Sequence, residues 1–373
     1  MLTKLSNLTA AAMAIIFLSA CAHVPVKTCG EPQFRPKLLL RLGNDCNTPD
    51  GMRLLRSTGE MFVACPNFNE PKYPGKIMKI TPGNKWELVC MMPPHPDTGH
   101  ACPMGLDFGP DGNLYVVDNQ YFYNKAHKSR IMRVIMKNGK AVRIETAVEG
   151  LKLANAVMFR GADMFVTDTF FDRADKPGMS GVYRIRLAEM NKGVVKLLPK
   201  DRCEKDPHFF MEMHTKRLIS RGDWAGADGL TIDSEGNLYS GNFGDGTLYK
   251  ATFNPDGTKK SSGVFVYDGR WTCCDGIFYD AKRNCIFITD SAKNAIHIVW
   301  LPEGKLTTLW ENGDTDGANG LLDQPCEPAI RGNDLLIVNF DMPFPGLKNS
   351  RYDKFHTISV IDISRLKRPK SAQ

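Results

Sequence analysis

Short apolar runs separated by turns rich in Gly, Asn and Asp recur along most of the chain. The clearest unit begins with the run 227–232, passes through a Gly-Asn turn at 236–237, and continues with a second apolar run from Leu238. Two apolar runs joined by a tight turn are typical of a β-hairpin. Two further strand-like runs follow this hairpin, at 246–250 and 263–267.

The hairpin pattern occurs six times. The matching position at its start falls at Asp50, Met104, Asn155, Asp228, Asp275 and Glu327, with steps of 54, 51, 73, 47 and 52 residues. Four short strands in a repeat of roughly fifty residues are typical of a propeller blade, whereas a β-sandwich does not repeat at this period. We therefore predict an all-β chain that forms a six-bladed β-propeller over residues 37–366.

The ring of blades has to close. Only one strand-like run, 357–361, follows the last hairpin, so blade six lacks its outer strand. The apolar run 37–42 precedes blade one and has no other place in the pattern. We expect this N-terminal strand to complete blade six, which would hide two sheet edges that otherwise promote aggregation. The alternative is a free N-terminal segment.

The innermost strands of a propeller line its central channel, so the six starts should converge at one mouth. No Lys or Arg occupies these positions, and four of them are carboxylates: Asp50, Asp228, Asp275 and Glu327. Carboxylates that face one another in a partly dehydrated channel repel, and a bound cation, raised pKa values or salt bridges would offset this. Oxygen ligands suit Ca²⁺ best, with Zn²⁺, Mn²⁺ and Mg²⁺ as alternatives. The competing interpretation, Asp-Gly turn chemistry, accounts poorly for Asn155 and Glu327.

All six repeats together resemble the senescence-marker-protein/gluconolactonase/luciferin-regenerating family, six-bladed propellers with one divalent ion at the axis. In that family a Glu, an Asn three blades later and an Asp in the next blade hold the ion. Glu327, Asn155 and Asp228 follow the same cyclic order, although the Glu lies here in the last blade of the chain. The resemblance implies that these three are metal ligands and that Asp228 can also act as general base. Asp275 and Asp50 would add charge to the site.

One departure from the family concerns the substrate. The sugar-acid lactonases of this family contact their substrate through an Arg and an Asn one blade before the ligand Asn. This chain reads Ala-Cys-Pro-Met at that place, residues 101–104. Met104 therefore indicates a substrate more apolar than a sugar lactone. Asp290, followed by Ser291, is a further substrate contact by resemblance. Arylesterase, lactonase or phosphotriesterase-like propellers would be equally close functional relatives.

Polar residues also end the second strands, at Asp118, Asp168, Asn242 and Asp290, where they would orient the ligands or simply cap turns.

The step from blade three to blade four is about twenty residues longer than the others. We assign the excess to 202–224, which contains His208 and Trp224 and would be either a lid over the mouth or a packed surface loop. His100 precedes blade two on the same face. His100 and His208 are candidate proton shuttles, and Trp224 is a candidate substrate contact.

The N-terminus precedes the fold. Lys4 and the apolar stretch 8–18 form the charged and hydrophobic regions of a signal peptide, too short to span a membrane. The residues Leu-Ser-Ala-Cys at 18–21 resemble a bacterial lipobox, so we expect removal of 1–20 and lipidation of Cys21. Ala22, rather than Asp, favours the outer membrane. The remaining expectations are a linker at 21–36, a basic tail at 367–373, and an exported, membrane-anchored monomer.

Composition changes this picture in two ways. The net charge of +7 is scattered, which argues against nucleic-acid binding. Ten cysteines besides Cys21 are an even number, which in an oxidising compartment predicts disulfides. The adjacent pair Cys273 and Cys274 could join to each other or belong to two bridges.

The function that fits these features best is a metal-dependent hydrolase of a lactone or other ester. A propeller that binds a ligand or protein and holds only a structural ion is the alternative. A quinone-dependent sugar dehydrogenase fits less well, because the strand starts offer neither an axial-face His nor basic residues for the quinone carboxylates.

Overall fold

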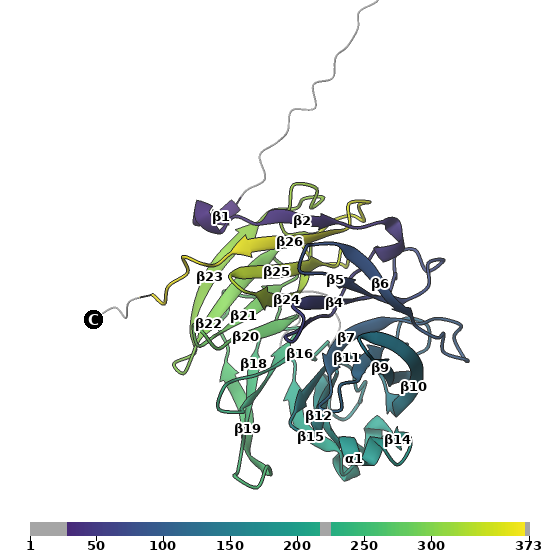
Figure 1. The fold of residues 1–373 in the computed structure, drawn as a ribbon. Helices are drawn as coiled ribbons and strands as arrows, with labels where there is room; N and C mark the ends of the chain where they lie inside the picture. The colour runs from purple at the N-terminus through teal and green to yellow at the C-terminus, as the bar shows by residue number, and fades with distance from the viewer. Residues whose placement is uncertain (1–27, 217–224, 370–373) are drawn as a thin grey trace, which may run out of the picture.

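The structure, a computed structural model, describes residues 28–216 and 225–369 of the chain. Six sheets of four or five strands are arranged around a common centre (Figure 1). The first strands of the sheets contact one another in a closed circle, β3–β7–β11–β16–β20–β24–β3. The predicted six-bladed β-propeller is therefore confirmed. The signal segment, Cys21 and Trp224 lie outside the described residues.

The first three blades run outward from the axis in sequence order. Blade one contains β3 (Met52–Leu55), β4 (Glu60–Cys65), β5 (Lys76–Ile80) and β6 (Trp86–Met91). Blade two contains β7 (Pro103–Phe108), β8 (Leu114–Asp118), β9 (Ser129–Lys137), β10 (Lys140–Leu151) and the parallel β14 (Val195–Lys196). Blade three contains β11 (Ala154–Arg160), β12 (Asp163–Asp168), β13 (Met179–Arg186) and β15 (Phe209–His214).

The other three blades also run outward in sequence order, except that the N-terminal strands β1 and β2 are the outermost strands of blades five and six. Blade four contains β16 (Ala227–Ile232), β17 (Leu238–Asn242), β18 (Leu248–Phe253) and β19 (Lys259–Val266). Blade five contains β20 (Ile277–Asp280), β21 (Cys285–Asp290), β22 (Ala295–Trp300), β23 (Lys305–Asn312) and β1 (Thr28–Gly30). Blade six contains β24 (Pro325–Arg331), β25 (Asp334–Asn339), β26 (Thr357–Asp362) and β2 (Lys37–Arg41). The short helices are η1 (Pro32–Phe34), η2 (Asn44–Cys46), η3 (Lys200–Lys205) and α1 (Leu187–Met190).

The N-terminal strand closes the ring as predicted. β2 pairs antiparallel with β26, from Lys37 opposite Val360 to Arg41 opposite Thr357. β2 thus supplies the fourth strand that the C-terminal part of blade six lacks. The segment expected to be a linker also takes part in the fold, because β1 pairs antiparallel with β23 at the edge of blade five.

The second strand of each blade lies in the middle of the core. Every residue of β8, β17 and β21 is buried, and β4, β12 and β25 are buried from their second residue onward. Strands covered on both faces read as continuous apolar runs rather than as an alternation of apolar and polar residues. The second strands therefore read as short apolar runs, and the repeat was recognisable in the sequence from these runs.

Part of the segment expected to be a lid or a packed surface loop is instead a strand. Within the described part of 202–224, residues 209–214 form β15, which pairs with β13 from Met179 opposite His214 to Tyr183 opposite Phe209. The apolar residues near Val195, which look like the outer strand of blade three, instead pair with β10 of blade two. A second strand was therefore needed to complete blade three, and this accounts for the longer step.

The disulfide prediction is wrong for this structure. All ten cysteines in the described part of the chain are free thiols, and eight of them are buried. The eight buried cysteines are members of the apolar core clusters, as buried cysteines commonly are. Cys273 and Cys274 are both fully buried and unpaired. No helix among the described residues is long and apolar enough to cross a membrane.

Candidate functional site

Close contacts between inner strands show which residue of each blade faces the axis. In blade four, the amide of Gly229 donates a hydrogen bond to the carbonyl oxygen of Asp275 at 3.2 Å. In blade five, the amide of Gly276 donates to the carbonyl oxygen of Cys326 at 2.7 Å. Cys326 is therefore the residue of blade six that corresponds to Asp275. We call the six equivalent positions the axial ring: Asp50, Met104, Asn155, Asp228, Asp275 and Cys326.

This assignment corrects the prediction for Glu327. Glu327 takes the position that Gly276 has in blade five, one residue past the axial ring. The inner strands begin Pro103-Met104 and Pro325-Cys326, and this shared proline was the signal that would have given the right alignment. A match by polarity selects the carboxylate of Glu327, next to the ring, instead of Cys326.

Glu327 still lies in the channel. Its side chain is partly accessible, and its carboxylate lies over the backbone of Gly276. Burial raises the pKa of Glu327 well above its ordinary range; Arg53 opposes the rise, and the charges of Asp50 and Asp275 add to it. Glu327 is thus electrostatically coupled to the axial ring without occupying it.

A pocket lies on the axial ring, and the space in and above it that no atom fills, open solvent included, is about 480 Å³. Five of the predicted positions and Cys326 line it: Asp50, Met104, Asn155, Asp228, Asp275 and Cys326. The rest of its lining is mostly apolar, from Phe122, Leu153, Ala225, Phe243, Phe340 and Phe344. A mostly apolar concavity with a few polar groups is typical of a small-molecule site.

The acidic side chains of the ring are in an unfavourable environment for charge. Asp50 is only 8% exposed, and burial raises its pKa to about 7. Burial and the charge of Asp50 also raise the pKa of Asp275 well above its ordinary range, against a hydrogen bond donated by Ser291. The fold therefore holds carboxyl groups where a proton or a cation has to neutralise them.

Asn155 and Asp228 form a contact between neighbouring blades. The Nδ2 of Asn155 donates a hydrogen bond to Oδ2 of Asp228 at 2.7 Å. Asp228 is 3% exposed, and Asn155 is partly accessible. The amide thereby fixes the carboxylate of Asp228 toward the axis. In blade two, next to Asn155 in the ring, Asn119 contacts Met104 through an Nδ2–Sδ distance of 2.9 Å.

The acids at the ends of the second strands hold the loops that carry the ring residues. Asp118 accepts a hydrogen bond from the amide of Cys102 at 2.8 Å, and Asp168 accepts one from the amide of Leu153, also at 2.8 Å. Asp290 accepts from the amide of Thr272 at 2.8 Å. Asp290 is 0% exposed and does not line the pocket, so its place is that of a positioning residue rather than of a substrate contact.

Neither candidate histidine lines the pocket. His208 lies beside β15 at the outer edge of blade three, where it contacts Asp206 at 2.8 Å and Glu189 at 3.4 Å. His100 stacks on Tyr123, with 3.8 Å between the ring centres. Acidic side chains hold His208 and a stacked ring holds His100, so the proton-shuttle prediction has no support from their placement.

Sequence reasoning missed the loop that does wall the pocket. Residues 340–356 connect β25 to β26 and contribute Phe340 and Phe344 to the lining. Phe68 packs between Phe340 and Phe122, with ring centres 6.2 and 4.9 Å away. Aromatic residues next to Pro and Gly gave no periodic signal that distinguishes a pocket wall from an ordinary surface loop.

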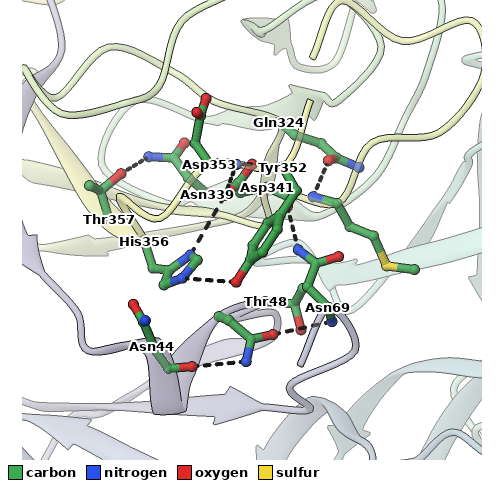
Figure 2. Close-up of polar contacts among 12 residues, drawn as sticks. Asn44, Thr48, Asn69, Gln324, Asn339, Asp341, Tyr352, Asp353, His356 and Thr357 are labelled. Atoms are coloured by element: carbon green, nitrogen blue, oxygen red, sulfur yellow. Dashed lines mark hydrogen bonds and ion pairs between the residues drawn. The ribbon is translucent and has the colours of Figure 1, made fainter. Parts of the chain in front are cut away.

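Figure 2 shows how this loop is fixed. The side-chain Nδ2 of Asn69 donates to the carbonyl oxygen of Asp341 at 2.7 Å, and His356 lies 3.6 Å from the carboxylate of Asp341. The hydroxyl of Tyr352 is 3.5 Å from His356. The carboxamide of Gln324, which lines the pocket, accepts from the amide of Met342 at 2.6 Å. The loop is therefore tied to blades one and six.

The donors at the axis are of the type that a hard divalent ion prefers: carboxylate and amide oxygens. Among the described residues, no three His, Cys, Asp or Glu side chains already converge in a metal-holding arrangement. An ion at the axis would therefore need the amide oxygen of Asn155, main-chain oxygens or water in addition to the acids.

No protein-family model and no curated protein matches the chain. Solved structures do match it in fold. A luciferin-regenerating enzyme has 12% sequence identity and a TM-score of 0.59 over 88% of this chain and 95% of its own. A gluconolactonase from Xanthomonas campestris has 10% identity and a TM-score of 0.51 over 91% and 98%. The calcium-binding protein regucalcin from Agrobacterium tumefaciens has 11% identity and a TM-score of 0.54 over 88% and 93%.

These neighbours are the proteins that the sequence resemblance pointed to, and they confirm the likeness of fold. At such identities the comparison establishes the fold alone, so any common chemistry has to be argued from the residues at the axis.

Proposed function

We propose that this protein is a metal-dependent hydrolase that opens a lactone or cleaves a related carboxylic ester. The observation that carries the proposal is the axial pocket: its floor contains acids, of which burial raises the pKa of Asp50 and Asp275, and aromatic side chains form its wall. The likeness of fold to a gluconolactonase, a luciferin-regenerating enzyme and regucalcin supports it.

The ligands we propose for the ion are Asp228, Asn155, Asp275 and Asp50. Their oxygen atoms suit Ca²⁺ better than a soft metal. A cation bound between Asp50 and Asp275 would offset the repulsion between their charges. When bound, the ion would polarise the carbonyl of the substrate and stabilise negative charge on its oxygen.

Asp228 is the residue we propose as general base. Its carboxylate would take a proton from a water molecule as the water oxygen attacks the acyl carbon, and the proton would return to the alkoxide oxygen when the C–O bond breaks. Asn155, hydrogen-bonded to Oδ2 of Asp228, would hold this carboxylate in place.

The wall of the pocket indicates the kind of substrate. Phe122, Phe340 and Phe344 offer apolar surface, and Met104 is 5% exposed beside them. No Lys or Arg is among the residues that line this pocket. An aryl ester or a lactone with an alkyl chain would bury its apolar part there, whereas the hydroxyl groups of a sugar lactone would lose hydrogen bonds to water.

The test compares Asp228→Asn with Asp334→Asn, which removes a carboxylate from β25 away from the pocket. We expect Asp228→Asn to lower kcat for alkyl lactones and aryl esters by about 100-fold or more, because general bases contribute 10²- to 10⁴-fold. Asp334→Asn should match the wild type. Equal turnover by Asp228→Asn and the wild type would contradict the proposed role of Asp228. A folded wild-type protein that hydrolyses no member of the panel would favour a binding propeller with a structural ion.

A further inference from the structure

A buried carboxyl group outside the axial ring, just before the inner strand of blade six, has no hydrogen-bond partner among the described residues. Asp323 precedes β24 and is 0% exposed. Neither of its carboxylate oxygens has a hydrogen-bond partner within the described part of the chain. Burying a carboxylate without donors costs several kcal/mol or more, so such a group must be neutralised by a proton or by a cation.

Acidic groups from two loops surround Asp323. The turn that contains Asp314 and Asp316 lies directly on it, because a Cβ at Gly317 would be 3.6 Å from Oδ2 of Asp323. Burial raises the pKa of Asp323 well above its ordinary range, and the charges of Asp341, Asp353, Asp314 and Asp316 raise it further.

The surrounding cations are engaged with other acids. Arg351 pairs with Asp353 at 3.3 Å, and His356 lies 3.6 Å from Asp341. Within the described part of the chain, no side-chain or main-chain donor makes a hydrogen bond to either carboxylate oxygen of Asp323.

We propose that a hard divalent cation of the Ca²⁺ type binds at Asp323, between the turn 313–320 and the loop 340–356. This site is separate from the axial ring. Three acidic side chains do not already converge in the described residues, so main-chain oxygens and water would complete the coordination. Ca²⁺ accepts six to eight such ligands in flexible geometry, whereas Zn²⁺ requires a compact set of four.

The consequence of this site would be a link between two loops that shape the axial pocket. Asp314 already accepts a hydrogen bond from Ser350, which joins the turn to the loop. Gln324, next to Asp323, and Phe340, next to Asp341, both line the pocket. A cation at Asp323 would therefore hold the pocket wall in place without touching the substrate.

The experiment titrates Ca²⁺ into the full chain after removal of metal by a chelator, with calorimetry as the readout. The variants are Asp323→Asn, Asp228→Asn and the control Asp334→Asn. We expect Asp323→Asn to lose one binding event that Asp228→Asn and Asp334→Asn retain. Ca²⁺ should also raise the Tm of the wild type more than that of Asp323→Asn, because a ligand that binds only the folded state stabilises it.

Asp316→Asn is the second variant, for the case that Asp323→Asn does not fold. It keeps the side-chain oxygen that accepts from the amide of Ala318 at 3.0 Å. We expect it to weaken the same event about 10-fold or more, because even outer-shell changes cost 10- to 100-fold in metal affinity. Unchanged Ca²⁺ stoichiometry and Tm shift in Asp323→Asn would overturn the proposal and show that Asp323 is a neutral buried acid. Unchanged affinity in Asp316→Asn would count against it equally. Neither outcome depends on whether the axial site binds metal.

Discussion

Asp50 illustrates how the fold sets the chemistry of a single side chain. The same residue in a flexible loop would ionise near pH 4, but between the inner strands burial raises its pKa to about 7. The folded chain therefore binds a proton at Asp50 over a pH range in which the unfolded chain does not. Under this condition the free energy of unfolding falls as the pH rises.

We predict this dependence for the metal-free protein between about pH 4 and pH 7. Replacing Asp50 by Asn removes the titrating group, so the unfolding free energy of Asp50→Asn should fall less over this range. The difference between the two proteins should be about 4 kcal/mol at most, since one pKa unit corresponds to about 1.4 kcal/mol. Urea denaturation at several pH values, with chelator present, measures it. Parallel pH profiles for wild type and variant would show that Asp50 is not held neutral.

Residue types along a repeat could be predicted better than their alignment. Asp50, Asn155, Asp228 and Asp275 were placed at the axis from the sequence, and the structure brings all four to one pocket. The sixth position was wrong by one residue, because polarity pointed to Glu327 whereas the backbone places Cys326 there. Only the contact between neighbouring strands resolves such a shift.

At the scale of elements, the inner strands of neighbouring blades approach each other until their backbones are in contact. A Cβ on Gly51 would lie 2.5 Å from the carbonyl oxygen of Met104 and 2.7 Å from Cα of Gly105. Neither atom belongs to a side chain that can move aside. The contact between blades one and two therefore requires glycine.

We predict that Gly51→Ala lowers the free energy of unfolding by about 1–3 kcal/mol or more, as overpacking of a close-packed interior does. The matched control is Gly263→Ala in β19, where no atom lies within 4 Å of the added Cβ. This variant should be as stable as the wild type or slightly more stable. Chemical denaturation of both variants gives the comparison. Equal stability of Gly51→Ala and Gly263→Ala would contradict the close approach.

The order of strands was predictable, but the choice of partner for an ambiguous strand was not. The apolar segment around Val195 has strand character, and the sequence does not say that it pairs with blade two. The real outer strand, β15, was taken for a loop because its Met and aromatic residues also suit a lid. The loop 340–356 carries weaker local signals, yet it forms the pocket wall because tertiary contacts of Asp341 fix it there.

For the whole molecule, closure of the ring is what creates the site. The residues of the axial ring come from six blades and span positions 50 to 326, and only a closed circle of inner strands brings them together. β2, pairing with β26, joins the two ends of that circle. Repeat length and strand count predicted this closure. Free thiols in place of the expected disulfides show that it is achieved by strand pairing and apolar packing.

The most direct test of the central claim is hydrolysis by the chelated and the Ca²⁺-restored protein. Purified protein is stripped of metal, assayed on alkyl lactones, aryl esters and a sugar lactone, and then assayed again after addition of Ca²⁺, with bound metal measured in each sample. We predict that turnover of the apolar substrates is lost with the metal, returns with Ca²⁺, and exceeds that of the sugar lactone. Undiminished turnover by metal-free protein, or no turnover by protein with Ca²⁺ bound, would contradict the account.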